Sequence, residues 1–248
     1  MAVHPSHPVT QEQVALLVHD LRNPLAGVTA ALQLLGMGLT PAEQEEIRTE
    51  AVWAATRLGR MISDLLLLHA ASCGGPAAET EVVALVPALD EAVRQAALGG
   101  RLDGVRLVLS CAAGAEGARL AGDPALVQPL LDHLLVTAVR QAAPGTVVPV
   151  RVTQDADGPC VSVAVPPGEG AAAWQGALAA VPEASGGGDA AASGWADRGW
   201  RGDLAGAALL MRLLAHRVGG SLTAGCDAAG GPVVHLRFPT LPPDALPG

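Results

Sequence analysis

The sequence predicts an α+β fold in two parts: a helical hairpin that forms a dimeric four-helix bundle, and a following domain in which helices cover one face of a mixed sheet. Two long apolar-periodic stretches, about 11–38 and 41–71, predict the hairpin. Shorter apolar runs with alternating helix and strand patterns after residue 80 predict the second part. A Gly- and Pro-containing segment, 72–80, separates them, so we place the domains at 1–72 and 80–240.

The first helix is predicted to start after Thr10. At about 100° per residue, His19 and Asn23 project from the side opposite to its apolar stripe. A proline in a helix interior costs roughly 3 kcal/mol, yet Pro24 lies midway along the pattern. Asn23 is also the only asparagine of the chain, and broken local rules tend to mark functional sites. The apolar stripe consists of Val14, Leu17, Leu21, Leu25, Val28, Leu32 and Leu35.

The second helix follows a turn at 36–39 and is predicted to begin with Thr40 as N-cap and Pro41 in the first helical position. Its apolar residues recur at alternating steps of four and three, which is a heptad pattern. They are Ile47, Ala51, Ala54, Leu58, Met61, Leu65 and Leu68. Two amphipathic helices in a hairpin leave apolar surface exposed unless another copy covers it. We therefore expect a homodimeric bundle.

The second domain is predicted to contain helices at 85–98, 124–141 and 204–218, the last ended by Gly219 and Gly220. Strands are expected near 105–111, 118–121, 147–153, 161–165, 222–225 and 233–238. The residues 166–203 are rich in Gly, Ala and Ser and read as a long loop. Trp174, Trp195 and Trp200 in this loop either dock a partner or pack onto the domain; the sequence does not decide between these roles.

Composition excludes several classes of function. A net charge of −9 provides no basic footprint for nucleic acid. No stretch reaches the roughly 18 to 20 apolar residues of a membrane span, and the N-terminus lacks a signal-peptide pattern. We expect a cytoplasmic protein with no metal site, whose input comes from another protein. The four cysteines lack the spacing of metal ligands, and we interpret them as reduced thiols. They are Cys73, Cys111, Cys160 and Cys226.

The run from His19 to Leu25, His-Asp-Leu-Arg-Asn-Pro-Leu, resembles the phosphoacceptor box of bacterial sensor histidine kinases. The resemblance implies that His19 is the phosphorylated nucleophile and that Asp20 is its general base. It also implies that Asn23 positions a water for dephosphorylation of a response regulator. The alternative is a chance run in which His19 and Asp20 are ordinary solvated side chains of a helix.

The second domain resembles the ATP-binding domain of the same family, on the landmarks Gly122-Asp123-Pro124, Pro144-Gly145 and Gly219-Gly220. Its nucleotide motifs depart from the family pattern. His133 and Thr137 stand where the family has two asparagines that hold magnesium, and Pro166 stands where an aspartate accepts from adenine. The later glycine cradle is reduced to 202–208, with side chains on glycine positions. We therefore expect neither ATP nor Mg to bind.

These observations predict a histidine phosphotransfer protein that relays phosphoryl groups through His19 to or from receiver-domain aspartates, with response-regulator phosphatase activity as a further role. The response regulator is expected to dock beside His19, and an upstream hybrid kinase is a further expected partner. Two alternatives stay open: an ATP-dependent kinase with a divergent pocket, and a non-enzymatic scaffold that binds a response regulator. The residues expected in the docking face are Arg22, Ala26, Gly27 and Ala30.

Overall fold

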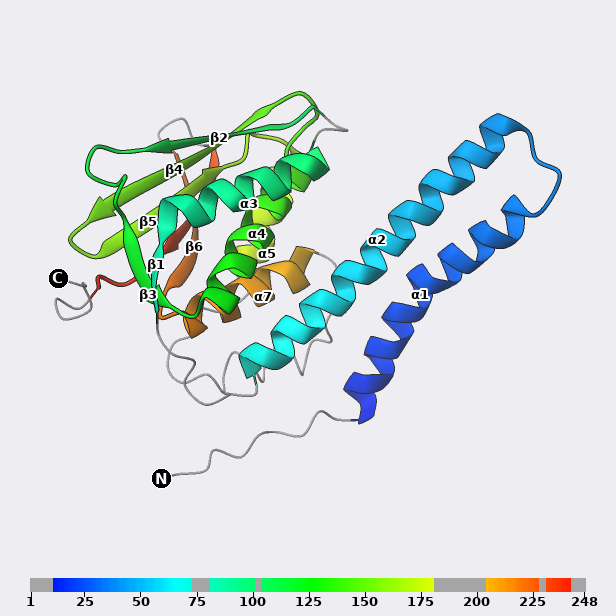
Figure 1. The fold of residues 1–248 in the computed structure, drawn as a ribbon, viewed down its shortest axis with the longest axis horizontal. Coiled ribbons are helices and arrows are strands. Elements are labelled where there is room, and N and C mark those ends of the chain that lie inside the picture. The colour runs from blue at the N-terminus through cyan, green and yellow to red at the C-terminus, as the bar shows by residue number, and fades with distance from the viewer. Residues whose placement is uncertain (1–10, 73–80, 101–103, 181–203, 228–230, 242–248) are drawn as a thin grey trace. The chain divides into compact units, whose positions relative to one another are not determined.

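The computed structural model describes residues 11–72, 81–100, 104–180, 204–227 and 231–241 (Figure 1). The order of elements confirms the predicted α+β fold, with a helical hairpin ahead of an α/β domain. The hairpin and the α/β domain are two separate compact units. The predicted interdomain segment lies outside the described residues for almost all of its length.

The hairpin consists of α1 (Gln11–Leu35) and α2 (Pro41–Ser72), within a few residues of the predicted bounds. The start of α2 is a capping box, as Thr40 predicts. Glu43 Oε2 accepts from the Thr40 hydroxyl at 2.7 Å and from the Thr40 N–H at 2.8 Å, while the Glu43 N–H donates to Thr40 Oγ1 at 3.4 Å. The Thr40 hydroxyl, followed by its N–H, lowers the pKa of the Glu43 carboxyl. This reciprocal pair ends the turn and sets the first residue of α2.

The predicted heptad of α2 is confirmed as the seam that contacts α1, since Ala54 and Met61 are buried and the other described members are half-buried. On α1 the predicted stripe is partly wrong, because Leu25 and Leu32 remain 52% and 62% exposed. The reason is that α2 contacts a narrow line of α1 residues, spaced three and four positions apart, that includes Pro24 and Ala31 from outside the predicted stripe. That line consists of Leu21, Pro24, Val28, Ala31 and Leu35.

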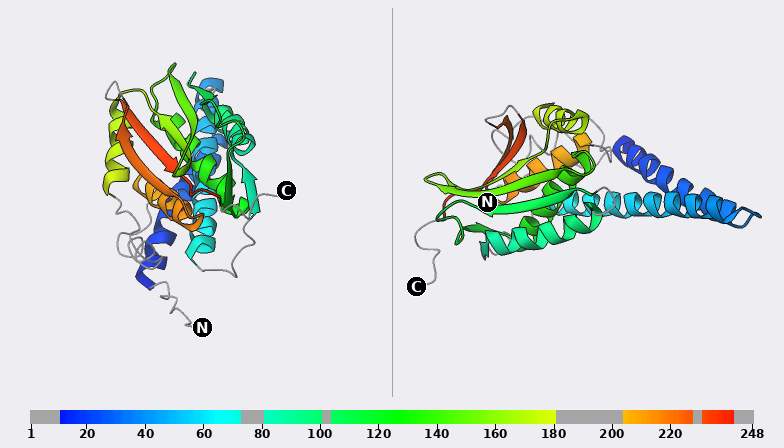
Figure 2. Two further views of the ribbon diagram at one scale, coloured as in Figure 1. Left: turned by 90° about the vertical axis from the view of Figure 1, so that its left-hand side faces the viewer. Right: turned by 90° about the horizontal axis from the view of Figure 1, so that it is seen from above.

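The α/β unit contains a sheet of five strands in the order β2-β4-β5-β7-β6 and a separate antiparallel pair of β1 and β3. Strand β2 is parallel to β4, and the remaining neighbours are antiparallel. The strands lie side by side in the views of Figure 2. Their bounds are Glu81–Ala84 (β1), Arg106–Cys111 (β2), Arg119–Gly122 (β3), Val147–Asp155 (β4), Gly158–Ala164 (β5), Ser221–Cys226 (β6) and Pro232–Arg237 (β7).

The core of this unit lies between the sheet and its helices, which are α3 (Leu85–Gly100), α4 (Pro124–Gln141), α5 (Glu169–Ala180) and α7 (Leu204–Arg217). Strand β4 alternates between exposed and buried positions, which is the period of a strand with one covered face. Its residues Val148, Val150 and Val152 are fully buried. The prediction that helices cover one face of a mixed sheet is therefore confirmed.

Two elements differ from the prediction. Residues 169–180, predicted as loop, form the helix α5, because Ala171, Trp174 and Leu178 recur at helical spacing and are all buried. Strand β1 was not expected, because its four residues are too few to show the alternation of a strand in the sequence. They form a strand through pairing with β3. The rest of the predicted loop, 181–203, lies outside the described residues.

Candidate functional site

The predicted phosphoacceptor segment lies within α1, where 19, 20 and 23 are all helical. The side chains of His19 and Asp20 lie outside the described part of the structure, so their orientation stays a prediction. The next turn is described, and Arg22 and Asn23 are both exposed. One turn of α-helix separates His19 from Asn23, and residues four apart lie on the same face of a helix. The backbone therefore aligns the predicted nucleophile with an exposed amide.

Pro24 lies about 100° around α1 from the exposed Asn23 and is buried in the seam with α2. A proline has no N–H to donate to the carbonyl four residues earlier, which here belongs to Asp20. The helix nevertheless continues through Pro24 to Leu35. Burial of the ring in the seam offsets part of the cost of the proline. This position fixes the segment that precedes it against α2 while leaving Asn23 in solvent.

The predicted docking residues Ala26, Gly27 and Ala30 are exposed on α1. Gly27 lies at the border of this face, since a Cβ added to it would be 3.6 Å from Ala54 Cβ of α2. Towards the hairpin turn, the exposed Leu34 and Met37 extend the surface with apolar side chains. The small side chains allow the backbone of another protein to approach α1 closely, and Leu34 and Met37 offer apolar area for it to cover.

The nucleotide-like region begins where α4 starts. Asp123 caps this helix by accepting from the Ala125 N–H at 2.9 Å, and Pro124 occupies the first helical position. Further along α4, Thr137 is only 7% exposed and His133 is half-buried. Thr137, whose hydroxyl the sequence left open as a metal ligand, is thus almost wholly buried.

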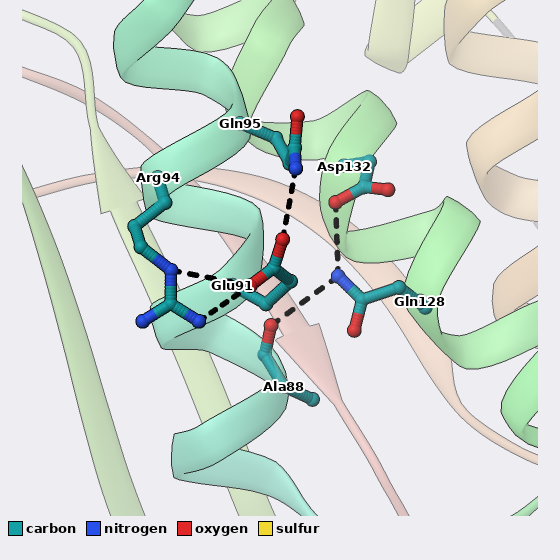
Figure 3. A network of polar contacts seen from close by, with 6 residues as sticks. All are labelled: Ala88, Glu91, Arg94, Gln95, Gln128 and Asp132. Atoms are coloured by element: carbon teal, nitrogen blue, oxygen red, sulfur yellow. Dashed lines mark hydrogen bonds and ion pairs between the residues drawn. The ribbon is translucent and has the colours of Figure 1, made fainter.

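Polar contacts within α3 and between α3 and α4 form a network (Figure 3). Gln128 Nε2 donates to Asp132 Oδ1 at 3.0 Å and to the Ala88 carbonyl at 3.3 Å. On α3, Glu91 accepts from Gln95 Nε2 at 2.8 Å and pairs with Arg94, and these contacts lower the pKa of Glu91. Gln128 therefore links α4 to α3 and also donates to the carboxylate of Asp132, which directly precedes His133.

Helix α5 packs against both α4 and α7 in this region. Its residue Gly170 lies so close to the end of α4 that an added Cβ would be 2.4 Å from the Gln141 carbonyl oxygen. Trp174 is 1% exposed, and its indole Nε1 has no hydrogen-bond partner among the described residues. Arg212 of α7 donates through Nη2 to the Leu178 carbonyl at 2.7 Å. Trp174 thus packs onto the domain, which settles the choice that the sequence left open for this residue; Trp195 and Trp200 lie outside the described residues.

Comparisons with known proteins bear on both units. Residues 10–73 match the family model of the His Kinase A (phospho-acceptor) domain. Over 128 residues the chain is 31% identical to Sensor protein DivL of Caulobacter vibrioides, a match that covers 51% of this chain and 16% of that protein. The chain therefore spans only a small part of the length of this relative.

Among solved structures, the chain is similar to the histidine kinase AdeS of Acinetobacter baumannii, with a TM-score of 0.59, 11% identity, and 89% of this chain and 97% of that chain covered. The cytoplasmic segment of the histidine kinase QseC gives a TM-score of 0.43 and 16% identity, over 64% of this chain and 78% of that chain. The similarity to AdeS extends across both units and shows a shared fold. Among the described helices, none combines the length and apolarity that a bilayer crossing requires.

Proposed function

We propose that this chain is a histidine phosphotransfer protein of two-component signalling, because residues 10–73 match the phosphoacceptor domain of histidine kinases and the chain shares the fold of a histidine kinase. His19 receives a phosphoryl group from a receiver-domain aspartate and passes it to another. The observation that carries this proposal is the His-Asp-Leu-Arg-Asn-Pro-Leu run of α1, which lies inside the matched phosphoacceptor region and has its Asn23 exposed.

The proposed transfer needs no nucleotide. An imidazole nitrogen of His19 attacks the phosphorus of the aspartyl phosphate, the bond from phosphorus to the carboxylate oxygen breaks, and a nitrogen–phosphorus bond forms. Asp20 accepts the proton that the imidazole gives up, since a nucleophilic nitrogen must be unprotonated. The reverse sequence delivers the group to the second receiver. Asn23, one turn away and exposed, holds a water for hydrolysis of a phosphorylated receiver docked on α1.

We further propose that this chain does not bind ATP and Mg productively. Pro166 replaces a carboxylate that would accept from adenine, and Thr137, which stands in the place of an asparagine, is buried. Each missing buried hydrogen-bond partner costs about 1 to 3 kcal/mol. Two or three losses amount to about 3 to 6 kcal/mol, or about a 10²- to 10⁴-fold loss of affinity. The close packing of α5 on α4 through Gly170 and Trp174 supports the same conclusion.

The hairpin is proposed to pair with a second copy of the chain. A second line of α2 residues with steps of three and four is exposed beside the seam, and on α1 Leu25 and Leu32 are exposed beside theirs. The line on α2 consists of Val52, Ala55, Gly59, Ile62 and Leu66. A four-helix bundle of two hairpins would cover both lines while leaving the face of Asn23 in solvent.

The test is phosphotransfer to the full chain from a candidate receiver that carries labelled phosphate on its aspartate. Label should appear on the wild-type chain and be absent from His19→Gln, whereas Asn23→Ala should still accept label and lose it more slowly to water. In parallel, the chain should incorporate no label from γ-labelled ATP with Mg. Label from ATP would instead establish a kinase, and a His19→Gln chain that keeps full signalling output would favour a scaffold.

A further inference from the structure

The face of the five-stranded sheet that the helices leave uncovered has an unusual charge. The whole chain has 24 acidic and 15 basic residues. Yet the five strands of this sheet contain Arg106, Arg151 and Arg237, and Asp155 is the single carboxylate within their bounds. Asp155 is paired with Arg237, whose Nη1 lies 2.7 Å from Oδ1. Arg106 and Arg151 are thus the cations that this face presents in an otherwise acidic protein.

These two arginines flank an exposed apolar centre on β2 and β4. Val108 is 47% exposed and pairs with the exposed Pro149, while Ser110 pairs with Arg151 and Arg106 with Val147. All lie on the uncovered face, because Val148 and Val150 between them point into the core. We call the residues Arg106, Val108, Ser110, Pro149 and Arg151 the open-face patch. The patch has a cation at each end and an apolar centre.

The spacing within the patch restricts what can cover it. Arg151 is paired with Ser110, which lies four residues after Arg106 on β2, so the two arginines are about 13 Å apart along the strand direction. Two turns of an α-helix advance by about 11 Å, so carboxylates seven or eight residues apart on one helix face match this distance. Apolar residues between them would lie over Val108 and Pro149.

We propose that the open-face patch is a docking surface for an acidic amphipathic segment of a partner protein, distinct from the receiver that docks on α1. Charge complementarity selects this occupant. Nucleic acid requires a row of many phosphate contacts, which two arginines in a chain of net charge −9 do not provide. An anionic membrane attracts clusters of several basic residues, and the patch again offers only two. Carboxylates separated by apolar residues satisfy both the charge and the apolar centre.

The probe is a fluorescent helical peptide with two Glu residues seven positions apart and Leu between them, compared with the same peptide carrying Gln in place of Glu. Anisotropy is measured with the full-length chain at low and at physiological ionic strength. The Glu peptide should bind more tightly than the Gln peptide, and less tightly as salt is added. The double variant Arg106→Glu/Arg151→Glu should weaken binding at least about tenfold, and Val108→Ser should weaken it without changing the salt dependence.

The matched control is Arg119→Glu, which reverses an exposed arginine on β3, outside the five-stranded sheet, and should leave binding within about twofold. Equal weakening by Arg119→Glu, or equal binding of the Glu and Gln peptides, overturns the proposal. Tighter binding of a DNA duplex or of vesicles containing anionic lipid than of the Glu peptide also overturns it. A change in molar mass of the double variant overturns it as well, since the patch would then serve self-association.

Discussion

The substitution Leu66→Glu tests the pairing of the hairpin with a second copy. Leu66 is 66% exposed on α2, in the line of residues that we assign to the dimer interface. The exposed fractions of Leu25, Leu32, Val52, Ile62 and Leu66 together correspond to almost three whole side chains. At about 2 kcal/mol for each fully buried aliphatic side chain, covering them contributes about 6 kcal/mol per protomer.

Leu66 by itself contributes about 1.3 kcal/mol of this, and a twofold axis makes each substitution count twice. Leu66→Glu should therefore cost at least about 2.6 kcal/mol of association free energy, because the carboxylate would also lose water in the interface. The dimer dissociation constant should rise about 10²-fold. Glutamate is a good helix former, so α2 itself should remain intact.

Sedimentation equilibrium over a range of protein concentrations measures this constant, and far-UV circular dichroism checks the helix content. The control is Leu34→Glu, because Leu34 is also exposed on the hairpin but lies on the other side of the α1 seam from Leu25 and Leu32. It should leave the dissociation constant nearly unchanged. If Leu66→Glu keeps the wild-type constant, or Leu34→Glu dissociates the dimer equally, our assignment of the interface is wrong.

Three further predictions concern local structure. Thr40→Ala should lower the stability of the hairpin by about 1 kcal/mol in thermal unfolding. Thr40→Ser should keep most of the wild-type stability, because serine retains the hydroxyl that is bonded to Glu43. An equal loss of stability in both variants would contradict the capping assignment. Gly158→Ala should destabilise the α/β unit by at least about 1 to 3 kcal/mol in urea unfolding. The reason is that Gly158 has φ +120° and that an added Cβ would lie 2.2 Å from the Phe238 carbonyl oxygen. The control Gly117→Ala should change the stability little, because Gly117 has open space around it. Burial lowers the pKa of His235, whose Nδ1 lies 2.9 Å from Ser162 Oγ, so the unfolded chain binds this proton more tightly than the folded chain. The free energy of unfolding should therefore fall as pH drops below about 6.5 and level off below the folded pKa, and His235→Gln should show a smaller slope; an unchanged slope would refute this.

The sequence alone determined the elements whose signals are local. The N-cap Thr40 and the heptad of α2 predicted the bounds of α2 within a few residues of those observed, and the predicted start of α4 at Pro124 is also observed. Helical periodicity and strand alternation depend only on neighbours along the chain, which explains why most of the second unit could also be predicted. The roles of His19, Asp20 and Asn23 rest on their order in the sequence and stay predictions for the phosphotransfer experiment.

The tertiary structure decided which apolar residues face which neighbour. Leu25 and Leu32 fit the stripe by periodicity, but contact with α2 buries Pro24 and Ala31 instead and leaves the two leucines exposed for another partner. The stretch around Trp174 reads as loop by composition, yet burial against α4 and α7 makes it a helix. Both outcomes depend on residues distant in the sequence, and burial against such residues outweighs the weak intrinsic preference of a short segment.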